Sequence, residues 1–526
     1  MKKLLLITML VFSSVMFGYS APLYEAGKTY KITILHTNDH HGHFWTSRHG
    51  EYGLAAQKTL IDQIKKEVSL DGGFTLVLSA GDINTGVPES DLQDAEPDFK
   101  AMSIIGYDAM VLGNHEFDKP NDVLAKQKEW AKFPFLGANV VKKSTGQPLY
   151  SPYVTYSVDG LRIAILGLTT GDTPQLVTPT NVEKLDFLDP IKTAKRLVPQ
   201  LKQKAGLVIA LTHMGYYDYG LYGSNAPGDV TLAQEVDGID VIIGGHSHTK
   251  LSAVDIQGDT VIAQAGDWGK NVGRLDLEFT DGEITVKDYK VIPVNKKKKI
   301  KKDGNTVRVF IEKEIPLDPM LATFLLEYQD KGSVELSQVI GVVNADFVGE
   351  RGIVRTQETN MGNLIAKTQR LKVGADVAVM NSGGIRTSLK QGKITYKDVL
   401  KVQPFSNTIC MVTLSGAELK QYLEIAANKS AGSGAFAQFD NVEIVMSGDK
   451  LEKAKVGGMM VQNSGSYKLA INSFAAAGGD GYMKVTNHPA FVDSGYIDAD
   501  VLKEYIQVNS PLNAAQFAPT NDVTRK

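Results

Sequence analysis

Cysteine is nearly absent from this sequence, since Cys410 is the only one among 526 residues. A single thiol excludes an intrachain disulfide, so the folded chain must be stabilised by its hydrophobic core. A chain of this length can bury enough apolar surface without covalent crosslinks. Cys410 itself lies in the apolar stretch 408–412, and we interpret it as a small buried hydrophobic residue rather than as a catalytic thiol.

An excess of charge of one sign is also missing. The 56 Lys and Arg residues nearly balance the 59 Asp and Glu residues, which leaves a formal net charge of −3. The chain as a whole has no basic field that would attract nucleic acid or acidic lipid, and we expect no nucleic-acid partner. A polyanionic substrate would have to be held locally, by metal ions or by individual arginines. With 43% hydrophobic and 22% charged residues, the composition indicates a globular protein of about two to four domains and excludes a disordered, collagen-like or polytopic membrane protein.

Long apolar runs are limited to the N-terminus. Lys2 and Lys3 precede the apolar run 4–17, and the small residues typical of a cleavage site follow at 18–20. This order is typical of a secretory signal peptide, and the run is too short for a comfortable membrane span. No later run reaches the roughly eighteen apolar residues that indicate a transmembrane helix. We therefore predict a signal peptide at residues 1–20 and export to the periplasm, with secretion as the alternative, and no membrane anchor.

The first half of the sequence alternates short apolar runs with helix-like segments. Runs that are apolar at nearly every position and rich in β-branched residues are typical of strands covered on both faces. Between the first two such runs, Leu54, Ile61 and Val68 fall near one face of a helix. This alternation predicts an α/β layered domain. The predicted strands are 32–35, 74–78, 109–112, 163–168, 207–211 and 241–243, with a helix over 54–68.

The second half indicates a connector and a further domain. Residues 296–302 read Lys-Lys-Lys-Lys-Ile-Lys-Lys, which we interpret as an exposed loop or hairpin tip. From Asp318 to Gln329 the apolar residues follow a helical spacing again, and a second domain begins near Gln338. That domain has predicted strands at 377–380, 408–413 and 469–471. The predicted organisation is an N-terminal domain at 21–317, a helical connector at 318–337 and a smaller C-terminal domain at 338–526.

Side chains that bind metals are concentrated at the ends of the predicted strands. Nine of the ten histidines precede residue 250. Five predicted strands are followed directly by Asp, His or Asn, at the carboxyl ends where open α/β sheets bind their ligands. A lone histidine is usually a hydrogen-bonded structural residue, whereas five such coincidences indicate one shared site. The candidate ligands are Asp39, His41, Asp82, Asn114, His213, His246 and His248.

This number of ligands exceeds what one tetrahedral zinc ion binds and suits two metal ions that share a carboxylate. Asp82 is the natural bridge, because a carboxylate has two oxygens and this one stands alone on its strand. Imidazole and carboxylate ligands together favour zinc, manganese or iron over calcium. His115 and Asp118 lie beside Asn114, and a histidine paired with a carboxylate can stabilise charge or protonate a leaving oxygen. The set predicts hydrolytic phosphoryl transfer.

The calcineurin-like metallophosphoesterases carry motifs that five segments of this sequence resemble. The segments are Asp39-x-His41, Gly81-Asp82, Gly113-Asn114-His115-Glu116, Thr212-His213 and Gly245-His246-Ser247-His248. Together with its second domain, the chain after residue 20 is similar to the 5′-nucleotidase family, most closely to the bacterial periplasmic UDP-sugar hydrolases through 36–45 and 81–99. The resemblance implies a four-layer α/β/β/α metallophosphoesterase domain and a smaller α/β nucleotide-binding domain.

The resemblance also implies an activity and a cofactor. The expected reaction is hydrolysis of nucleoside 5′-monophosphates and of nucleotide-sugar diphosphates by a monomer that uses two divalent metal ions. Zinc is the first expectation, with manganese or cobalt as alternatives. At one ligand position those bacterial enzymes carry glutamine where this sequence has His248, which is the common residue in the wider family. The metal preference of the first site therefore stays open.

The C-terminal domain offers arginines, aromatic residues and a carboxylate in glycine-rich surroundings. Arginine forks suit phosphate oxygens, and glycines let the backbone approach a ligand closely. Aromatic faces stack on any base, and a carboxylate accepts hydrogen bonds from ribose hydroxyls. By the resemblance, Phe405 and Phe474 match the pair that encloses the base, and Asp480 matches the ribose-binding aspartate. The other candidates are Arg351, Arg355 and Arg386 for phosphate groups and Asn381, a weaker one, for the base, while Phe436 and Phe439 are assigned to the core.

Two other functions compete with this interpretation. A 2′,3′-cyclic-nucleotide phosphodiesterase with 3′-nucleotidase activity belongs to the same superfamily, but the intact aromatic pair and Asp480 favour the 5′-nucleotidase. A nucleotide-binding export protein without catalysis would be expected to have lost Asp82, Asn114 or His115, and all three are present. The family resemblance further implies a large rotation of the C-terminal domain, and we expect its hinge within or beside 318–338.

Overall fold

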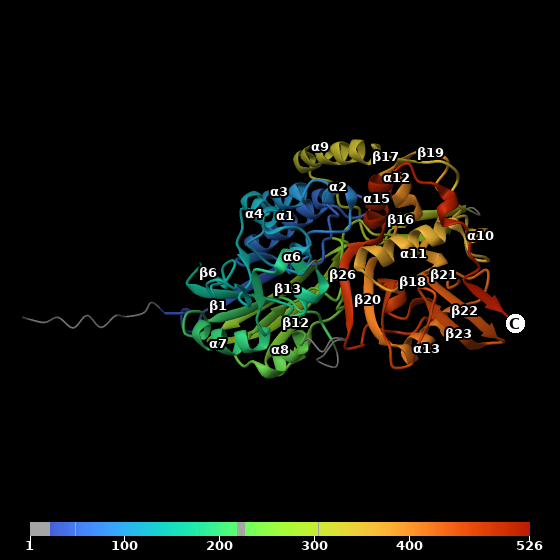
Figure 1. The fold of residues 1–526 in the computed structure, drawn as a ribbon. Coiled ribbons are helices and arrows are strands. Elements are labelled where there is room, and N and C mark those ends of the chain that lie inside the picture. Colours follow the sequence, from blue (N-terminus) through green and yellow to red (C-terminus); the bar gives the residue numbers. More distant parts are fainter. Residues whose placement is uncertain (1–21, 48, 178, 218–226, 303–304, 406) are drawn as a thin grey trace, which may run out of the picture.

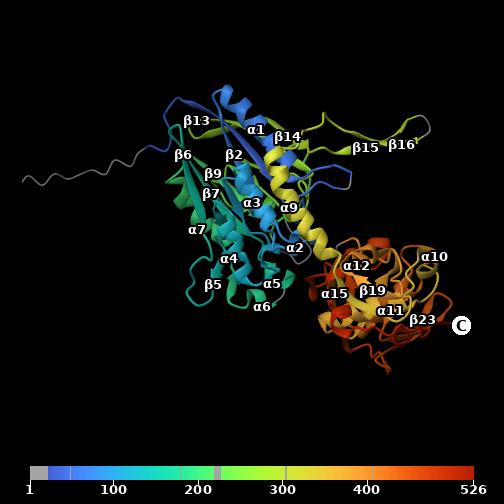
Figure 2. The same cartoon turned by 90° about the horizontal axis from the view of Figure 1, so that it is seen from above.

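The structure, a computed structural model, describes residues 22–47, 49–177, 179–217, 227–302, 305–405 and 407–526. It contains two α/β domains that lie side by side, with helix α9 (Pro319–Leu336) running from the first to the second (Figures 1 and 2). The predicted signal peptide lies outside the described residues. Within the described ranges, none of the helices has the length and apolar character needed to cross a membrane.

Two six-stranded mixed sheets form the centre of the N-terminal domain. In the first, four parallel strands are extended at one edge by two antiparallel ones. In the second, four parallel strands lie between two antiparallel edge strands. The first sheet has the order β14 (Glu283–Pro293), β13 (Asn271–Thr280), β1 (Thr29–Thr37), β2 (Phe74–Ser79), β3 (Ala109–Val111) and β4 (Phe135–Leu136). The second has the order β11 (Asp255–Gln257), β12 (Thr260–Ala263), β10 (Val241–Ile243), β9 (Leu207–His213), β7 (Leu161–Thr169) and β6 (Tyr153–Val158).

These sheets face each other, and helices cover the outer side of each, which confirms the predicted four-layer α/β/β/α fold. Successive residues of a strand point to opposite faces, so in β1 Ile34 contacts the core between the sheets and Leu35 the core under the helices. A third core lies between the second sheet and its own helices. The helices on the first sheet are α1 (Leu54–Leu70), α3 (Glu96–Ile105), α4 (Asn121–Trp130) and α9, and those on the second are α7 (Pro190–Lys202) and α8 (Asp229–Glu235). Short elements complete the domain: α2 (Pro88–Asp91), α5 (Thr173–Leu176), α6 (Pro179–Val182) and the ladder of β5 (Val140–Lys142) with β8 (Leu185–Phe187).

The six strands predicted in the first half are present as β1, β2, β3, β7, β9 and β10, and the predicted helix is α1. The apolar positions of α1 explain its placement, because Leu54, Ile61, Ile64 and Val68 are all buried against the first sheet. Five of the six strands carry predicted metal ligands just beyond or at their carboxyl ends. Three of them, β1, β2 and β3, belong to the first sheet, while β9 and β10 belong to the second. Both sheets therefore contribute to a single edge.

Helix α9 contacts the cores of both domains. Leu321 and Leu325 are buried in the core that α1 and α3 form with the first sheet, and the backbone oxygen of Tyr328 accepts a hydrogen bond from the Gln93 amide at 2.9 Å. Leu336, at the last turn, is buried in the core of the C-terminal domain instead. The predicted connector is thus a helix that belongs to the first domain for most of its length.

The C-terminal domain is built around a five-stranded sheet with the order β21 (Ala437–Asp440), β18 (Val377–Asn381), β25 (Ser466–Asn472), β20 (Thr408–Ser415) and β26 (Phe491–Ile497). The three strands predicted here lie within β18, β20 and β25. A four-stranded sheet, β24 (Met459–Met460), β23 (Lys450–Val456), β22 (Val442–Ser447) and β27 (Val523–Arg525), and a ladder of β17 (Val339–Val343) with β19 (Gly392–Thr395) flank it. The helices are α10 (Arg351–Val354), α11 (Asn360–Val373), α12 (Tyr396–Val402), α13 (Gly416–Ala427), α14 (Ser473–Ala476) and α15 (Asp498–Asn509).

The basic run at 296–302 is the first strand of a two-stranded ribbon, β15 (Lys297–Lys302) and β16 (Asn305–Phe310). Of the two forms that the sequence allowed, a loop or a hairpin, the structure has the hairpin.

The two sheets of the N-terminal domain are in close contact beside Gly167 of β7. A Cβ atom at this position would lie 2.3 Å from the Cβ atom of Leu136 and 2.8 Å from its carbonyl carbon. The backbone NH of Ala138 also donates a hydrogen bond of 2.8 Å to the Gly167 oxygen across the junction. A side chain here would have to push backbone aside, because Leu136 belongs to a strand.

We predict that Gly167→Ala lowers the free energy of unfolding of the N-terminal domain by about 1–3 kcal/mol, the usual cost of overpacking a core. Differential scanning calorimetry of the metal-loaded protein would measure this as a lower midpoint for that domain. Gly171→Ala is the matched control, since its Cβ would meet nothing closer than an ordinary contact of 3.8 Å with Pro190. Equal midpoints for the two variants would show that the sheets are not in close contact at Gly167.

Candidate metal centre and substrate pocket

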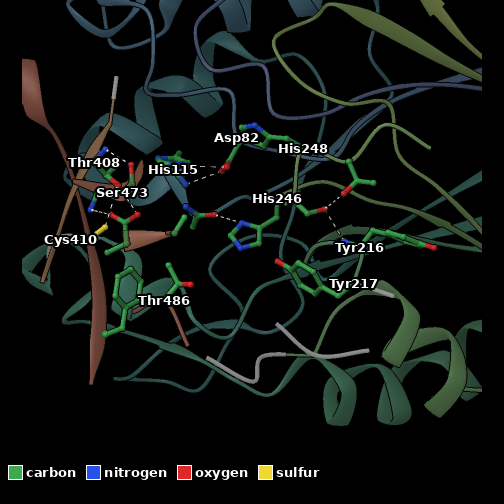
Figure 3. A pocket seen from close by; sticks show the side chains of 17 residues that line it. Asp82, His115, Tyr216, Tyr217, His246, His248, Thr408, Cys410, Ser473 and Thr486 are labelled. Atoms are coloured by element: carbon green, nitrogen blue, oxygen red, sulfur yellow. Dashed lines mark hydrogen bonds and ion pairs between the residues drawn. The ribbon is translucent and has the colours of Figure 1, made fainter. Parts of the chain in front are cut away.

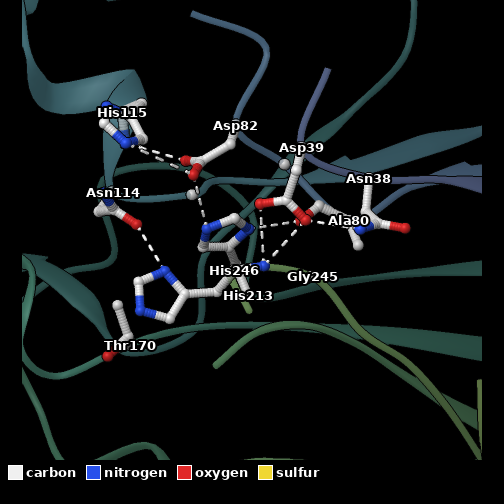
Figure 4. A network of polar contacts seen from close by, with 12 residues as sticks. Asn38, Asp39, Ala80, Asp82, Asn114, His115, Thr170, His213, Gly245 and His246 are labelled. Carbon is white, nitrogen blue, oxygen red and sulfur yellow. Dashed lines mark hydrogen bonds and ion pairs between the residues drawn. The ribbon is translucent and has the colours of Figure 1, made fainter. Parts of the chain in front are cut away.

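The seven predicted metal ligands lie together at the edge where the strands of both sheets end. Figure 4 shows Asp39, Asp82, Asn114, His213 and His246 among them. Within each of three groups of side chains, the ligand atoms lie within 4.8 Å of one another. The groups are Asp39, His41 and His248; Asp82, His213 and His246; and His41, Asp82 and His115. The first two groups share no member, and the third links them through His41 and Asp82. This arrangement corresponds to two adjacent cation positions rather than one.

Asp82 lies between the two positions. Its Oδ2 atom is 3.0 Å from Nε2 of His213 on one side and 3.9 Å from Nε2 of His41 on the other. Its Oδ1 atom accepts a hydrogen bond of 2.9 Å from the backbone NH of His115. One carboxylate therefore faces imidazoles of both groups, as the predicted bridge requires.

The remaining candidates complete the two groups. The amide oxygen of Asn114 lies 2.9 Å from Nδ1 of His246. On the other side, Nε2 of His248 is 3.1 Å from Nε2 of His41 and 3.4 Å from Oδ1 of Asp39. His248 is the most accessible member, with 40% of its side chain exposed, whereas Asp39 is fully buried.

Five of the seven candidates have a left-handed backbone, which is uncommon for residues other than glycine. Their φ angles are 51° at Asp39, 50° at His41, 54° at Asp82, 77° at His246 and 54° at His248. Such a residue turns the chain sharply, so that each side chain points back over the end of the sheet. The surrounding structure must hold these conformations, because each costs on the order of 1 kcal/mol or more.

Backbone oxygens orient two of the imidazoles. The Nδ1 atom of His213 lies 2.6 Å from the oxygen of Ala80, and Nδ1 of His41 lies 2.7 Å from the oxygen of Thr85. A hydrogen bond from Nδ1–H to a carbonyl leaves Nε2 as the free nitrogen that faces the centre. The rings are therefore fixed in the tautomer that binds a cation through Nε2.

Glu116 holds the backbone of the centre, a role that sequence reasoning missed although the residue lies within the motif at 113–116. Its carboxylate accepts hydrogen bonds from the backbone NH groups of Asp82 at 2.9 Å, Ile83 at 2.8 Å and Gly113 at 2.7 Å. Burial and the neighbouring Asp82 raise the pKa of Glu116 to about 7. Gly113 is required beside it, since a Cβ atom there would lie 2.1 Å from Oδ1 of Asp82.

The chemistry of the cluster fits divalent cations. The Nε2 atom of His213 is buried without a hydrogen-bond partner, although Asp82 is close to it. Burial lowers the pKa of His213, but the Asp82 carboxylate outweighs this effect and raises it to about 9. Burial also opposes ionisation of Asp82, yet His213 and His115 hold its pKa well below the ordinary value. Divalent metal ions would take the place of the protons on these imidazoles and satisfy the unpaired nitrogen.

His115 and Asp118, predicted as the catalytic pair, form an ion pair at the rim of the centre. Nδ1 of His115 is 2.6 Å from Oδ2 of Asp118, which also accepts a hydrogen bond from the Thr85 hydroxyl. Nε2 of His115 lies 3.9 Å from Oδ2 of Asp82. Burial disfavours the imidazolium, but Asp118 and Asp82 raise the pKa of His115 well above its ordinary value. This geometry can hold a proton on Nε2, facing the metal centre.

Most of the predicted substrate residues line one cavity of about 400 Å³ in the C-terminal domain. They are Arg355, Asn381, Arg386, Phe405, Phe474 and Asp480. The rings of Phe405 and Phe474 are 52% and 44% exposed, which is unusual for phenylalanine and leaves their faces free for a ligand. Asp480 accepts a hydrogen bond of 3.1 Å from the amide of Asn381, and the guanidinium of Arg386 lies 5.4 Å from the centre of the Phe405 ring.

Arg351, the remaining predicted substrate residue, does not line the cavity. It is exposed at the start of α10, and its charge adds to burial in lowering the pKa of Arg355. Asn407, which sequence reasoning missed, lines the cavity instead. No local signal marked it, since asparagine after a Phe-Ser pair is common in loops. Of the two aromatics assigned to the core, Phe439 is buried and Phe436 is only half-buried.

Two further cavities lie between the domains. One, of about 570 Å³, is lined by Asn114 and His246 from the metal centre and by Thr408 and Asp493 from the C-terminal domain (Figure 3). The other, of about 330 Å³, reaches from the histidines of the centre to Phe405. Phe405 is thus a wall shared with the substrate cavity.

Cys410, beside the larger of these cavities, is a free and fully buried cysteine, and burial raises the pKa of its thiol well above the ordinary value. This confirms its interpretation as a buried small residue.

Known proteins match this chain over both domains. Residues 32–250 match the family model for calcineurin-like phosphoesterases, and residues 339–487 match that for the 5′-nucleotidase C-terminal domain. A 5′-nucleotidase of Vibrio cholerae is 49% identical over 96% of this chain and 95% of its own length. Protein UshA of Escherichia coli K12 is 47% identical over 96% of both chains. In fold, the chain is similar to the NAD nucleotidase of Haemophilus influenzae, with a TM-score of 0.75, 22% identity and coverage of 95% of this chain and 99% of that one.

The similarity to the first two relatives extends over nearly the full length of all three chains, so both domains and the connector are covered. The chain therefore belongs to the 5′-nucleotidase family, whose members join a calcineurin-like metallophosphoesterase domain to a 5′-nucleotidase C-terminal domain.

Proposed function

We propose that this protein hydrolyses nucleoside 5′-monophosphates to nucleoside and phosphate, and also cleaves nucleotide-sugar diphosphates such as UDP-sugars. The observation that carries the proposal is the proximity of two sites in one chain. A centre suited to two cations shares a wall, Phe405, with a cavity that offers two exposed phenyl rings, a carboxylate and arginines. The names of the relatives, 5′-nucleotidase among them, support the same reaction.

The metal ions in this proposal are two divalent cations held by the seven candidate ligands. One would be bound by Asp39, His41 and His248, the other by Asn114, His213 and His246, with Asp82 shared. Imidazole nitrogens and carboxylate oxygens suit zinc first, and manganese or cobalt as alternatives. When bound, such a pair supplies Lewis acidity to the phosphoryl group and makes water nucleophilic at neutral pH.

His115 is the proposed acid. Asp118 orients the ring through Nδ1 at 2.6 Å, which leaves Nε2–H directed at the metal centre. Because the raised pKa of His115 keeps this proton on the ring at neutral pH, it can be donated to the leaving ribose oxygen or stabilise the charge that develops there. Loss of Asp118 would leave the imidazole in the wrong orientation rather than remove it.

Recognition of the nucleoside is assigned to the C-terminal domain. The base would stack between Phe405 and Phe474, a contact that tolerates every base because each has a flat aromatic face. Asp480, held by the Asn381 amide, would accept hydrogen bonds from the ribose hydroxyls. Arg355 and Arg386 would bind phosphate oxygens, with Arg351 contributing charge from outside the cavity.

A movement of the C-terminal domain is part of the proposal. The substrate cavity and the metal centre are separate in this conformation and meet only at Phe405. A phosphate held by the arginines would therefore have to be carried to the metal ions by rotation. Within the predicted connector, 318–337, the end of α9 is the favoured hinge, because Leu336 already packs with the C-terminal domain while Leu321 packs with the N-terminal one. The boundaries 21–317 and 338–526 remain predictions.

Export to the periplasm as a monomer remains a prediction from the sequence. A cyclic-nucleotide phosphodiesterase is the second candidate, and it is less favoured because the phenylalanine pair and Asp480 line one cavity, as a 5′-nucleotidase requires.

We predict that metal-stripped protein is inactive and that zinc, manganese or cobalt, but not calcium, restores hydrolysis of AMP and UDP-glucose. Product release would be measured for AMP, UDP-glucose and 2′,3′-cyclic AMP with each metal. Asp82→Asn is the control, and it should lose more than the roughly 10–100-fold that removal of an outer-shell partner costs, because both ions share this residue. Faster turnover of the cyclic diester would favour the second candidate. Adenosine binding without turnover under any metal would refute the catalytic assignment and leave the substrate cavity intact.

We predict that His115→Ala lowers kcat for AMP by about 10²–10⁴-fold, the usual contribution of a general acid. The loss should be much smaller for p-nitrophenyl phosphate, since a good leaving group needs no proton. Asp118→Asn should show the same selectivity with a smaller loss. Equal losses for the two substrates would mean that His115 acts on metal binding or on folding rather than on the leaving group.

We predict that a crosslink across the larger interdomain cavity slows AMP hydrolysis by at least about tenfold, because turnover requires the domains to rotate. Thr249→Cys and Thr486→Cys introduce thiols on its two walls, and a bismaleimide would join them while the native thiol stays buried. The two single variants, treated with the same reagent, control for blocking of the cavity. Full activity of the crosslinked protein would eliminate the rotation.

A further inference from the structure

The ribbon of β15 and β16 carries an unusual density of positive charge. Between Lys297 and Phe310 the sequence has five lysines, one arginine and a single acidic residue, Asp303, which lies outside the described residues. Figure 2 shows this basic hairpin projecting from the N-terminal domain and running clear of the C-terminal domain. It contrasts with a chain whose overall charge is close to balanced, so the positive charge is local to this ribbon.

The register of the two strands sorts the side chains into two different faces. Residues directly opposite each other in an antiparallel pair share a face, and successive residues alternate. Lys299 is opposite Arg308, so one face carries those two together with Lys297 and Lys301. Ile300 is opposite Val307 and Lys298 is opposite Val309, so the second face has an apolar stripe with lysines on it, Lys302 being the next in line. The ribbon is thus cationic on one face and amphipathic on the other.

Within the described ranges, most of these charges have no partner. The ammonium of Lys297 donates a hydrogen bond of 2.6 Å to the oxygen of His49 and lies 4.3 Å from the centre of the Phe310 ring, which anchors the base of the ribbon. Among the described residues, no ion pair or side-chain hydrogen bond involves the other four lysines or Arg308. They are Lys298, Lys299, Lys301 and Lys302, and all four are exposed.

The apolar stripe is likewise not used by the fold. Ile300, Val307 and Val309 are half-buried by neighbouring side chains of the ribbon, and none of them belongs to a core of the described residues. Lysines do protect the open edges of strands from pairing with other chains. That role needs only one or two of them, and it does not call for the isoleucine and valines beside them.

We propose that the basic hairpin docks the N-terminal domain on an anionic lipid bilayer. Ile300, Val307 and Val309 would enter the boundary between headgroups and acyl chains, and Lys298 and Lys302 on the same face would contact lipid phosphates. Lys299, Lys301 and Arg308 on the other face would add to the electrostatic attraction. A polynucleotide is a weaker match, because sequence-tolerant binding of nucleic acid uses aromatic rings for stacking and the only ring on the ribbon, Phe310, is engaged by Lys297. The contact is peripheral and reversible, and it does not depend on the proposed catalytic function.

The test uses the full mature chain, loaded with metal, in sedimentation with vesicles. We expect binding to vesicles of phosphatidylcholine mixed with phosphatidylglycerol, weak binding to phosphatidylcholine alone, and release at high ionic strength, where exposed charges are screened. Substitution of Lys298, Lys299, Lys301 and Lys302 by Gln should lower the partition coefficient at least about tenfold. Ile300→Ser with Val307→Ser should weaken binding several-fold without changing the charge. Inorganic phosphate should displace no more protein than sodium chloride does at the same ionic strength.

The matched control replaces four exposed lysines elsewhere, Lys143, Lys192, Lys195 and Lys450, by Gln, which changes the net charge equally and should leave binding unchanged. Hydrolysis of soluble AMP by all variants reports that each is folded. Three results would overturn the proposal: no binding of the parent protein to anionic vesicles, an equal loss in the control variant, or displacement by free phosphate beyond that by sodium chloride at the same ionic strength. Hairpin-dependent binding of a short single-stranded RNA, without vesicle binding, would assign the ribbon to nucleic acid instead.

Discussion

The Asp82 carboxylate is buried between imidazoles of two groups, and much of the N-terminal domain serves to keep it there. A buried charge costs several kcal/mol unless it is paired, and here the pairing comes from His213 on one side and His41 on the other. The left-handed turn at Asp82 directs the side chain, Glu116 binds its backbone NH, and Gly113 leaves the space that its oxygen occupies. If the carboxylate were displaced, it could no longer face imidazoles of both groups at once.

This requirement explains why two sheets are needed. Parallel strands within one sheet lie side by side and approach a central point from one direction, whereas the facing sheets approach it from two. The first sheet contributes the carboxylates Asp39 and Asp82, and the second contributes His213 and His246. Carboxylates and imidazoles therefore meet across the junction between the sheets. The close contact at Gly167 with Leu136 helps to set the spacing of that junction.

In the proposed function, the N-terminal domain binds the phosphoryl group and the C-terminal domain binds the nucleoside, because these two parts of a nucleotide need different interactions. A phosphoryl group requires concentrated positive charge, which the N-terminal domain can offer through cations bound to buried ligands. A nucleoside requires flat apolar faces and a few hydrogen bonds, which exposed rings and Asp480 provide in an accessible cavity. Because the two sites lie on different domains, the metal centre can be buried while the substrate cavity stays accessible. They meet at Phe405, which lines both cavities.

Much of this organisation can be predicted from the sequence, because residue type and short-range spacing already determine it. Apolar runs such as 207–211 mark strands, and the Asp, His and Asn residues after them mark candidate ligands. His115 and Asp118, three positions apart, mark the candidate catalytic pair. Features that depend on distant contacts could not be predicted. Nothing local indicated that Glu116 would bind four backbone NH groups, or that Asn407 rather than Arg351 would line the cavity. The sequence by itself determined the main strands and helices, the set of candidate ligands and the class of reaction. The tertiary structure decided which sheet carries each candidate ligand, because that depends on packing between segments more than a hundred residues apart.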